Sequence, residues 1–316
     1  MVRLRMFCKL AAVVAIGVSV AAWRVAISDD SPAATTAAEF PPELVAFTPS
    51  PSNPVFSGAG PGHWDQKIRE RGWILHESDG YHLWYTGYDG TKTGIRRLGY
   101  ATSHDGIEWR RHAGNPLIAD HWVEDMMVVK HDGLYYMFAE GRDDQAQWLT
   151  SRDRVQWERR GTLDIRYKTG KPLTPGPFGT PTAWFENGTW HLFYERQDAA
   201  VWLATSRDLK VFTHVQDEPV LNPGPGEYDR SMIALNQIIR RNGRYYAYYH
   251  GLDLTREPKL WTTAMASSSD LIHWTKYPGN PLLRENKSSG IVVEDGPGYR
   301  LYSMHDSVQL HLPTGK

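Results

Sequence analysis

The segment Asp79-Gly80-Tyr81-His82-Leu83-Trp84-Tyr85 places a two-residue turn directly ahead of an aromatic strand, and four variants of it follow along the chain. Asp-Gly and Asn-Gly pairs favour tight β-hairpins because both turn positions need a positive φ. The first aromatic residue of each copy recurs every 54 or 55 residues, at Tyr81, Tyr135, Trp190, Tyr245 and Tyr299. Such a constant period predicts a repeat architecture.

A second motif lies between the hairpin turns. Ser103-x-Asp105-x-x-x-Trp109 recurs in similar form at three later sites, which start at Ser151, Ser206 and Ser268. Short polar side chains at these positions can cap the backbone amides of a turn. Because an apolar strand also precedes each hairpin turn, every repeat supplies roughly four strands, the content of one propeller blade. We therefore predict an all-β fold, a five-bladed β-propeller with four-stranded antiparallel blades, over residues 55–316.

The first 28 residues have the pattern of an export segment. Arg3, Arg5 and Lys9 precede an uncharged apolar run from Leu10 to Trp23, which is shorter than the roughly 20 residues of a membrane-spanning helix. We predict a cleaved signal peptide over residues 1–28, with an uncleaved N-terminal anchor as the alternative. The protein would then be secreted or periplasmic, without a membrane span in the mature chain. Residues 29–54, rich in Ser, Pro, Ala and Thr, are predicted to be a linker or a loosely packed lead-in to the propeller.

The overall composition narrows the classes of partner. A net charge of −1 and the lack of a Lys/Arg-rich stripe argue against nucleic acid, because release of counterions by a basic surface drives that binding. The 13 Trp and 16 Tyr suit surfaces that stack on sugar rings, although most of them are expected to be strand residues. The single cysteine, Cys8, lies in the export segment, so no disulfide or thiolate chemistry is expected in the mature chain.

Two connectors share the sequence Gly-Asn-Pro-Leu, at residues 114–117 and 279–282. Together with the repeat length and the Ser-x-Asp-x-x-x-Trp turns, they resemble the five-bladed propeller superfamily that holds glycoside hydrolase families 43, 32, 62, 117 and 130. The resemblance implies an active site at one end of the central channel, where the innermost strands start. Families 43 and 32 place an Asp of blade one, an Asp of blade two and a Glu of blade three there. Two of these act as acid and as base or nucleophile.

Two aspartates match that pattern. Asp65 corresponds to the base or nucleophile and Asp125 to the residue that modulates the acid, although a lone Asp at a strand start often only caps a turn. Glu124 would replace Asp125 if the register differs by one. Blade three departs from the pattern, because its inner strand starts with Gly176-Pro177-Phe178-Gly179-Thr180-Pro181-Thr182 and has no carboxylate. Glu195 is the nearest candidate for the general acid.

Blade four supplies further candidates. Asp229 lies 16 positions before its marker aromatic, as Asp65 does, and is expected to face Asp65 across the channel mouth. His250 and His305 follow aromatic strands; by resemblance to family 117 either could be the acid, or they could bind substrate. No cofactor is required, although the resemblance allows a calcium ion in the channel beside His305. The residues beside the candidate acids could be a platform for sugar rings or could pack the blades: Trp64, Trp122, Phe178 and Tyr228.

The predicted function is that of an exported glycoside hydrolase, acting on a poly- or oligosaccharide in the central pocket. One alternative is a carbohydrate-binding propeller without catalysis, which would keep the aromatic residues and lose the acid. The other is a phosphorylase resembling family 130, which would need basic side chains in the pocket to hold phosphate. The residues considered for that role are Arg69, Arg142, Arg230 and His250.

Overall fold

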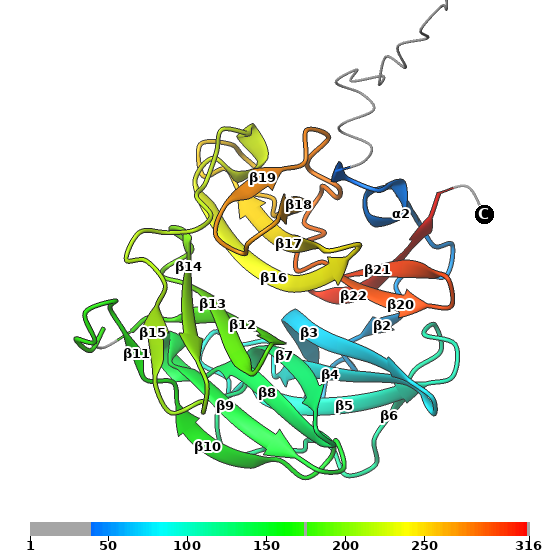
Figure 1. Ribbon diagram of the computed structural model, residues 1–316. Helices are drawn as coiled ribbons and strands as arrows, with labels where there is room; N and C mark the ends of the chain where they lie inside the picture. Colours follow the sequence, from blue (N-terminus) through cyan, green and yellow to red (C-terminus); the bar gives the residue numbers. More distant parts are fainter. Residues whose placement is uncertain (1–38, 174–175, 315–316) are drawn as a thin grey trace, which may run out of the picture.

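Five sheets surround one axis in the computed structural model, which describes residues 39–173 and 176–314 (Figure 1). The innermost strands are β3 (Lys67–Glu77), β7 (Glu124–His131), β12 (Gly179–Glu186), β16 (Met232–Arg241) and β20 (Ile291–Asp295). Each contacts the innermost strand of the next blade, and β20 contacts β3, so the ring is closed. The predicted five-bladed β-propeller is confirmed.

The remaining strands complete the blades in sequence order. Blade one adds β4 (Gly80–Tyr88), β5 (Arg97–Ser103) and β6 (Arg110–Arg111), and blade two adds β8 (Leu134–Glu140), β9 (Ala146–Ser151) and β10 (Glu158–Thr162). Blade three adds β13 (Thr189–Glu195), β14 (Val201–Ser206) and β15 (Phe212–His214), with β11 (Ile165–Arg166) parallel to β15 at its edge. Blade four adds β17 (Arg244–Leu252), β18 (Thr262–Ser268) and β19 (Trp274–Lys276), and blade five adds β21 (Gly298–Met304) and β22 (Ser307–Pro313). Two short 3-10 helices, η1 (Arg142–Asp144) and η2 (Glu227–Asp229), lie in the connecting loops.

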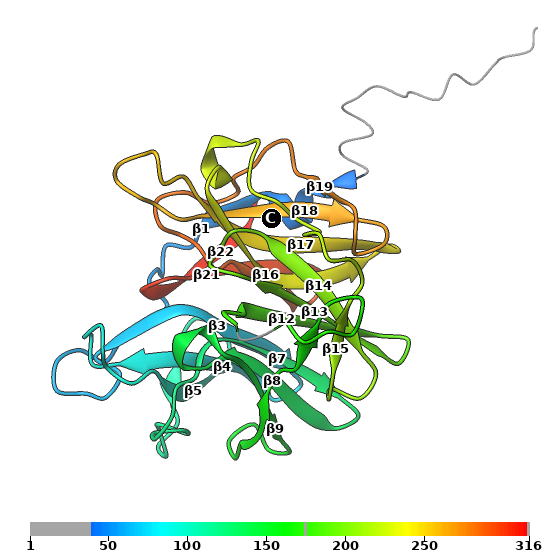
Figure 2. The same ribbon diagram turned by 90° about the vertical axis from the view of Figure 1, so that its left-hand side faces the viewer.

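Blade five is completed by the N-terminal part of the described chain. Strands β1 (Phe47–Pro49) and β2 (Phe56–Ser57) both pair with β22, and Figure 2 shows β1 beside it. The short helix α2 (Pro42–Val45) packs Leu44 into the core between blades four and five, together with Phe40. The prediction that residues 29–54 form a linker is therefore wrong for residues 40–54. The Pro- and Ser-rich composition of this segment gave no indication of β1, the strand that closes blade five and is only three residues long.

The predicted turns have the expected geometry. Three hairpin turns hold both of their residues at positive φ, at Asp132-Gly133, Asn187-Gly188 and Asn242-Gly243. In the Ser-x-Asp motif, Ser103 Oγ accepts from the Gly106 amide at 2.9 Å, and Asp105 Oδ1 accepts from the Ile107 amide at 2.8 Å. In two copies the Trp that ends the motif packs on an aromatic residue of the blade before it, Trp157 against Trp84 and Trp274 against Phe193. The motif therefore shapes the turn and joins neighbouring blades.

The predicted export segment lies within residues 1–38, outside the part of the chain that is described. Across residues 39–173 and 176–314, no helix is long and apolar enough to cross a lipid bilayer. Export and location stay predictions.

Candidate active site at the propeller axis

Four of the five innermost strands carry a bulge near their start. Their pairing with the second strand shifts between Arg69 and Trp73, Glu124 and Met127, Gly179 and Thr182, and Leu235 and Gln237. A bulge frees residues from the hydrogen-bond ladder and re-aims their side chains, and bulges are common beside active sites. Asp125 and Thr180 lie in these bulges with φ of 44° and 46°, values that are rare outside glycine and unfavourable for a β-branched Thr.

The side chain of Arg71 ties these bulges together at the axis. Its guanidinium donates to Thr182 Oγ1 at 2.6 Å, to the Pro181 carbonyl at 2.8 Å and to the carbonyl of Asp125. A longer bond of 3.3 Å reaches the Asn236 carbonyl in blade four. Arg71 is completely buried, and burial lowers its pKa to about 10 while nearby carboxylates oppose that shift. A cation from blade one therefore fixes the inner strands of blades two, three and four.

Asp125 and Glu124 point into different surroundings at the start of β7. Glu124 forms an ion pair with Arg69 and accepts a hydrogen bond of 2.7 Å from Trp122 Nε1. Burial raises the pKa of the Asp125 carboxyl well above its ordinary value, and the negative charges of Glu70 and Glu124 add to that shift. Asp125 is nevertheless partly exposed, whereas Glu124 is buried. Asp125 is thus a partly exposed residue whose carboxyl group favours its protonated form.

Two buried carboxyl groups lie close to Asp125 at the ends of the second strands. Glu195 ends β13 opposite Gly179 in the register, and a Cβ on Gly179 would lie 1.6 Å from Glu195 Oε1 and 3.0 Å from Glu140 Oε1. Glycine at this position therefore lets both carboxyl groups approach the start of β12. Burial, followed by repulsion from Asp125, raises the pKa of Glu140 well above its ordinary range. Burial, followed by repulsion from Asp198, raises the pKa of Glu195 to about 8.

Asp198 extends this group towards solvent. Its amide donates to Glu195 Oε2, and burial together with the charges of Glu70 and Asp144 raises its pKa to about 7. We call Glu70, Asp125, Glu140, Glu195 and Asp198 the axial carboxyl cluster. Its members come from blades one, two and three, as the resemblance implied for the catalytic acids, although Asp125 and Glu195 are the only two of them that were predicted from the sequence.

His250 lies on the blade-four side of the axis and is a hydrogen-bonding residue. Its Nδ1 lies 2.8 Å from Asn236 Oδ1, an oxygen that can only accept, so Nδ1 carries the proton and Nε2 is left as an acceptor. Burial and the charges of Arg71 and His305 lower the pKa of His250 to about 3. A histidine that stays neutral in this way is a poor proton donor, so the idea of His250 as general acid is not supported. Binding of a sugar hydroxyl through Nε2 fits the geometry.

His305 does not occupy the position equivalent to His250. The residues five places after each marker aromatic are Thr86, Glu140, Glu195, His250 and Met304, so His305 is displaced by one. Its Nδ1 lies 3.0 Å from Ser288 Oγ and 3.9 Å from Glu70 Oε1. The predicted calcium ion beside His305 stays a prediction.

Asp65 does not reach the axis. Its carboxylate accepts hydrogen bonds from Tyr85 on β4 at 3.0 Å and from Arg111 on the outermost strand β6 at 2.8 Å. Asp65 is buried, and the side chain points outward along blade one. The structure thus places it in a network that ties the strands of one blade together, away from the axial carboxyl cluster.

Asp229 occupies the equivalent place in blade four, as the shared spacing predicted. Its carboxylate pairs with Lys276 on the outermost strand β19 and accepts a hydrogen bond of 3.2 Å from Tyr249. The expectation that Asp65 and Asp229 face each other across the channel mouth is therefore wrong. Both side chains turn outward because a cation of the outermost strand draws them there.

The predicted sugar-stacking residues lie within the blades. Trp64 stacks on Tyr85 at 5.9 Å, and Phe178 packs edge-on against Tyr194 at 5.3 Å. The hydroxyl of Tyr228 lies 3.1 Å from that of Tyr249, in a cavity over blade four rather than at the axis. For these three residues, the alternative of blade packing describes the geometry better.

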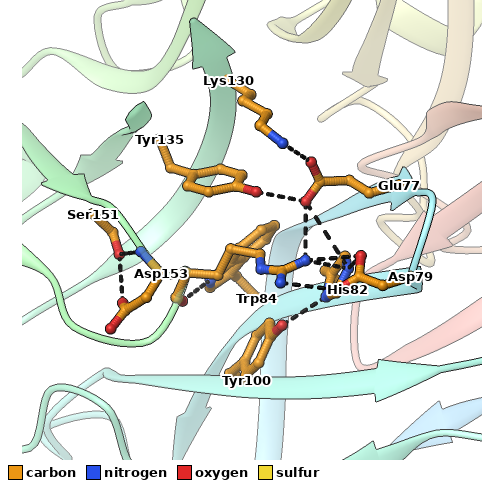
Figure 3. A network of polar contacts seen from close by, with 10 residues as sticks. Glu77, Asp79, His82, Trp84, Tyr100, Lys130, Tyr135, Ser151 and Asp153 are labelled. Atoms are coloured by element: carbon orange, nitrogen blue, oxygen red, sulfur yellow. Dashed lines mark hydrogen bonds and ion pairs between the residues drawn. The ribbon is translucent and has the colours of Figure 1, made fainter. Parts of the chain in front are cut away.

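The described residues contain one group of side chains with the spacing of a metal site, formed by Glu77, Asp79 and His82. Figure 3 shows Glu77, Asp79 and His82 close together, and Arg154 of blade two forms hydrogen bonds to all three. Its Nη1 lies 3.1 Å from Glu77 Oε2, 3.0 Å from Asp79 Oδ1 and 2.7 Å from His82 Nε2. The guanidinium supplies the positive charge that a metal ion would bring, so the cluster is an electrostatic clamp between blades one and two.

The arginines considered for phosphate binding are dispersed. Arg69 lies at the axis and is paired with Glu124, whereas Arg230 pairs with Asp253 at 3.4 Å over blade four. Arg142 lies beside Trp122 in a separate cavity. Among the arginines considered and Arg71, Arg69 and Arg71 are the two that bring positive charge to the axial carboxyl cluster.

Several residues of the site were missed by the sequence-based prediction. A signal for Glu140 was present, because Glu140 and Glu195 hold equivalent positions in blades two and three. Arg71 and Asn236 had no such signal. They face the axis only because their strands are bulged, and bulges leave no reliable mark in a single sequence.

No protein-family model matches the chain. A curated protein, the 1,2-β-oligomannan phosphorylase of Thermoanaerobacter sp. (strain X514), is 27% identical over 218 residues, which are 63% of this chain and 70% of that protein. A solved structure of a putative glycosidase from Bacteroides thetaiotaomicron is similar with a TM-score of 0.66 and 18% identity, over 85% of this chain and 97% of that one. A further structure has a TM-score of 0.66 and 17% identity, over 86% and 95% of the two chains. It is described with the GH130 family of mannoside phosphorylases, which contains glycoside hydrolases that target β-1,2 mannosidic linkages in Candida mannan.

These similarities confirm the expected resemblance at the level of the fold. The five-bladed propeller of this chain is one that glycoside hydrolases and glycoside phosphorylases share. They support the phosphorylase alternative better than the prediction of a family 43-like hydrolase, because the curated relative is a phosphorylase.

Proposed function

We propose that this protein cleaves the glycosidic bond of a β-1,2-linked mannoside at the axial carboxyl cluster, with Asp125 as the proton donor. The observation that carries the proposal is the place of Asp125, a partly exposed residue at the start of β7 in the axial carboxyl cluster. Burial and the charges of Glu70 and Glu124 raise its pKa well above the ordinary value, which favours the protonated form. A general acid must hold a proton at the working pH and reach the leaving oxygen. The substrate class is taken from the name of the curated relative.

Inorganic phosphate is the first candidate for the attacking group. The curated relative that is a phosphorylase supports it, and so do the two cations at the axis, Arg69 on the rim and Arg71 below it. In this case the products would be a mannose phosphate and a shortened oligosaccharide.

Water is the second candidate, and the charge of the site favours it. The axial carboxyl cluster brings five carboxyl groups near two arginines, and a phosphate dianion would be repelled by those that are ionised. Asp198, with a pKa raised to about 7, is about half ionised near neutral pH, and Glu195, with a pKa raised to about 8, is ionised to a smaller extent. Either could act as the base that activates water once it has lost its proton.

The experiment is to incubate the protein with β-1,2-mannobiose and longer oligomannosides, with and without phosphate, and to identify the products. Release of mannose phosphate only when phosphate is present supports phosphorolysis, and release of free mannose in its absence supports hydrolysis. No cleavage of any oligosaccharide on a broad panel would favour the carbohydrate-binding alternative without catalysis.

Asp125→Asn tests the assignment of the acid, and Asp65→Asn is the matched control. Loss of a general acid typically lowers the rate about 10²–10⁴-fold. The rate of cleavage by Asp125→Asn should therefore be lower than that of the wild-type protein by a factor in that range. Asp65→Asn should keep the rate within a few-fold, because its carboxylate contacts Tyr85 and Arg111 and no group of the axial cluster. It should instead lower the free energy of unfolding, by about 1–3 kcal/mol. A severe loss of rate in a folded Asp65→Asn variant would return Asp65 to the mechanism.

A further inference from the structure

A second polar cavity of about 330 Å³ lies over blade two, next to the axial site. The loop before β7, the loop between β8 and β9, and the outermost strand β10 form its walls. Trp122 separates it from Glu124, because the indole Nε1 donates to Glu124 Oε2 on the far side. The side chains that matter for its chemistry are Asp120, His121, Trp122, Arg142, Gln147 and Arg159, so the lining holds one carboxylate beside two arginines.

The cavity contains two arginines without a carboxylate partner in the described part of the chain. Arg142 is exposed, and its guanidinium lies 5.2 Å from the centre of the Trp122 ring. Arg159 donates from Nε to the amide oxygen of Gln147 at 3.0 Å, a neutral acceptor that leaves the other N–H groups free to bind a ligand. Its neighbour Arg160 behaves differently, since it pairs with Glu158 at 2.7 Å and lines another cavity.

A third polar group lies without a partner at the cavity. His121 Nδ1 lies 2.9 Å from Asp120 Oδ1, an oxygen that can only accept, so Nδ1 carries the proton and the neutral ring presents Nε2 as an acceptor. Nε2 is enclosed and without a hydrogen-bond partner among the described residues, which is unfavourable unless a water molecule or a hydroxyl group of a ligand binds it. An oxyanion would accept charge-assisted hydrogen bonds from both guanidinium groups, and a sugar hydroxyl beside it could donate to Nε2.

The walls of the cavity are held firmly. Arg96 lies on the other side of the Trp122 ring, 5.0 Å from its centre, and Gln147 Nε2 donates to the Trp122 carbonyl at 2.7 Å. In the loop between β8 and β9, Asp143 and Asp144 hold φ of 60° and 52°. This sharp turn directs Arg142 to the cavity, whereas Asp144 approaches Glu195 and Asp198 closely enough to raise their pKa values. One loop therefore borders both the cavity and the axial carboxyl cluster.

We propose that this cavity binds an oxyanion, a phosphate or a carboxylate or sulfate of similar size, next to the sugar-binding site. A sugar held at Asp125 that extends across Trp122 would bring a charged substituent into it. The inference deepens the proposed function in that the anion would be part of the carbohydrate. Free inorganic phosphate offers the same chemistry, and the experiment separates the two sources.

The test is a calorimetric titration of the full chain with inorganic phosphate, mannose 6-phosphate and mannose. Binding of either phosphate compound to the wild-type protein supports the site when it is weakened in the Arg142→Gln/Arg159→Gln variant, and the mannose titration measures any binding of the sugar alone at the axis. A mannose 6-phosphate that binds more tightly than inorganic phosphate indicates a substituent of the substrate, and the reverse order indicates the free ion. In the variant Arg142→Gln/Arg159→Gln, affinity should fall by about tenfold or more, because hydrogen bonds to charged groups are lost.

Arg160→Gln is the matched control and should bind like the wild-type protein. Both arginines of the cavity are exposed, so their replacement should leave the fold intact, which circular dichroism can check. The proposal is overturned if neither phosphate compound binds, or if the double variant binds as well as Arg160→Gln does. Because the titration involves no chemistry, it can be repeated with Asp125→Asn, and the result does not depend on whether the protein cleaves mannosides.

Discussion

At Glu195, a carboxyl group from the end of a second strand takes the place that an inner-strand residue was expected to fill. The start of β12 has no acid of its own, and Gly179 leaves room for the side chain of Glu195. The equivalent residue of blade two, Glu140, also ends a second strand and accepts from the Thr180 hydroxyl at 3.3 Å. Individual residues thus acquire their chemistry from burial and close carboxyl neighbours, and both raise the pKa.

We expect the pH dependence of the free energy of unfolding to show that Glu195 is a buried acid. The ordinary pKa of this group is 4.5, and the folded protein raises it to about 8. Between those values the folded state holds a proton that the unfolded chain has lost, so this group's contribution to stability falls as the pH rises. Chemical denaturation at pH 5, 7 and 9 should therefore show the wild-type protein losing stability relative to Glu195→Gln. Parallel pH profiles for the two proteins would show that Glu195 is not a buried acid.

At the scale of elements, closure of blade five depends on residues close to the N-terminal end of the described chain. Strand β1 supplies the outermost strand, and α2 anchors it through Leu44, whose carbonyl also accepts from the Tyr248 hydroxyl at 2.7 Å. Pairing the two ends of a chain within one blade removes an open seam from the ring. The folded unit therefore includes residues 40–54, ahead of the predicted start at Val55.

The variant Leu44→Ala measures that closure. Leu44 is completely buried, and the truncation of such a residue to alanine typically costs about 2–5 kcal/mol in the free energy of unfolding. Thr48→Ala, on the exposed side of β1, should change it by less than about 0.5 kcal/mol. Equal effects of the two changes, measured by chemical denaturation, would mean that the segment before β2 adds little to the propeller.

For the whole molecule, the axis is the place where the blades meet and where the candidate chemistry lies. Arg71 connects four of the five blades through hydrogen bonds to backbone carbonyls and to Thr182. Its charge also compensates the nearby Asp125, Glu140 and Glu195. The same residue therefore holds the ring together and makes a crowded group of acids tolerable.

Arg71→Met should destabilise the protein by about 3–5 kcal/mol, as expected when one partner of a buried charged group is removed. Arg71→Lys keeps the charge with fewer donors, so its free energy of unfolding should lie between that of Arg71→Met and that of the wild-type protein. A second readout separates charge from packing, since loss of Arg71 should raise the pKa of His250, which NMR can follow. If Arg71→Met is as stable as the wild-type protein, the axis is held by other contacts.

Much of the fold was predictable from the sequence. Asp-Gly and Asn-Gly turns and Ser-x-Asp caps depend on φ values and hydrogen bonds within a few residues, so each copy identifies its own hairpin, and five copies identify the blades. The short closing strand β1 was not predictable, because three residues carry too little pattern and pair with a strand more than 260 positions away.

The site was predictable only in part. The sequence determined that Asp125 starts the inner strand of blade two and that Glu195 ends the aromatic second strand of blade three, because both positions follow from the repeat. Only the tertiary structure decided that Asp65 and Asp229 turn outward to Arg111 and Lys276, and that Glu140 and Arg71 join the axis. Which side chains meet there depends on the register at four bulges and on contacts between blades. Those are set by the packing of the closed ring, and no stretch of neighbouring residues encodes them alone.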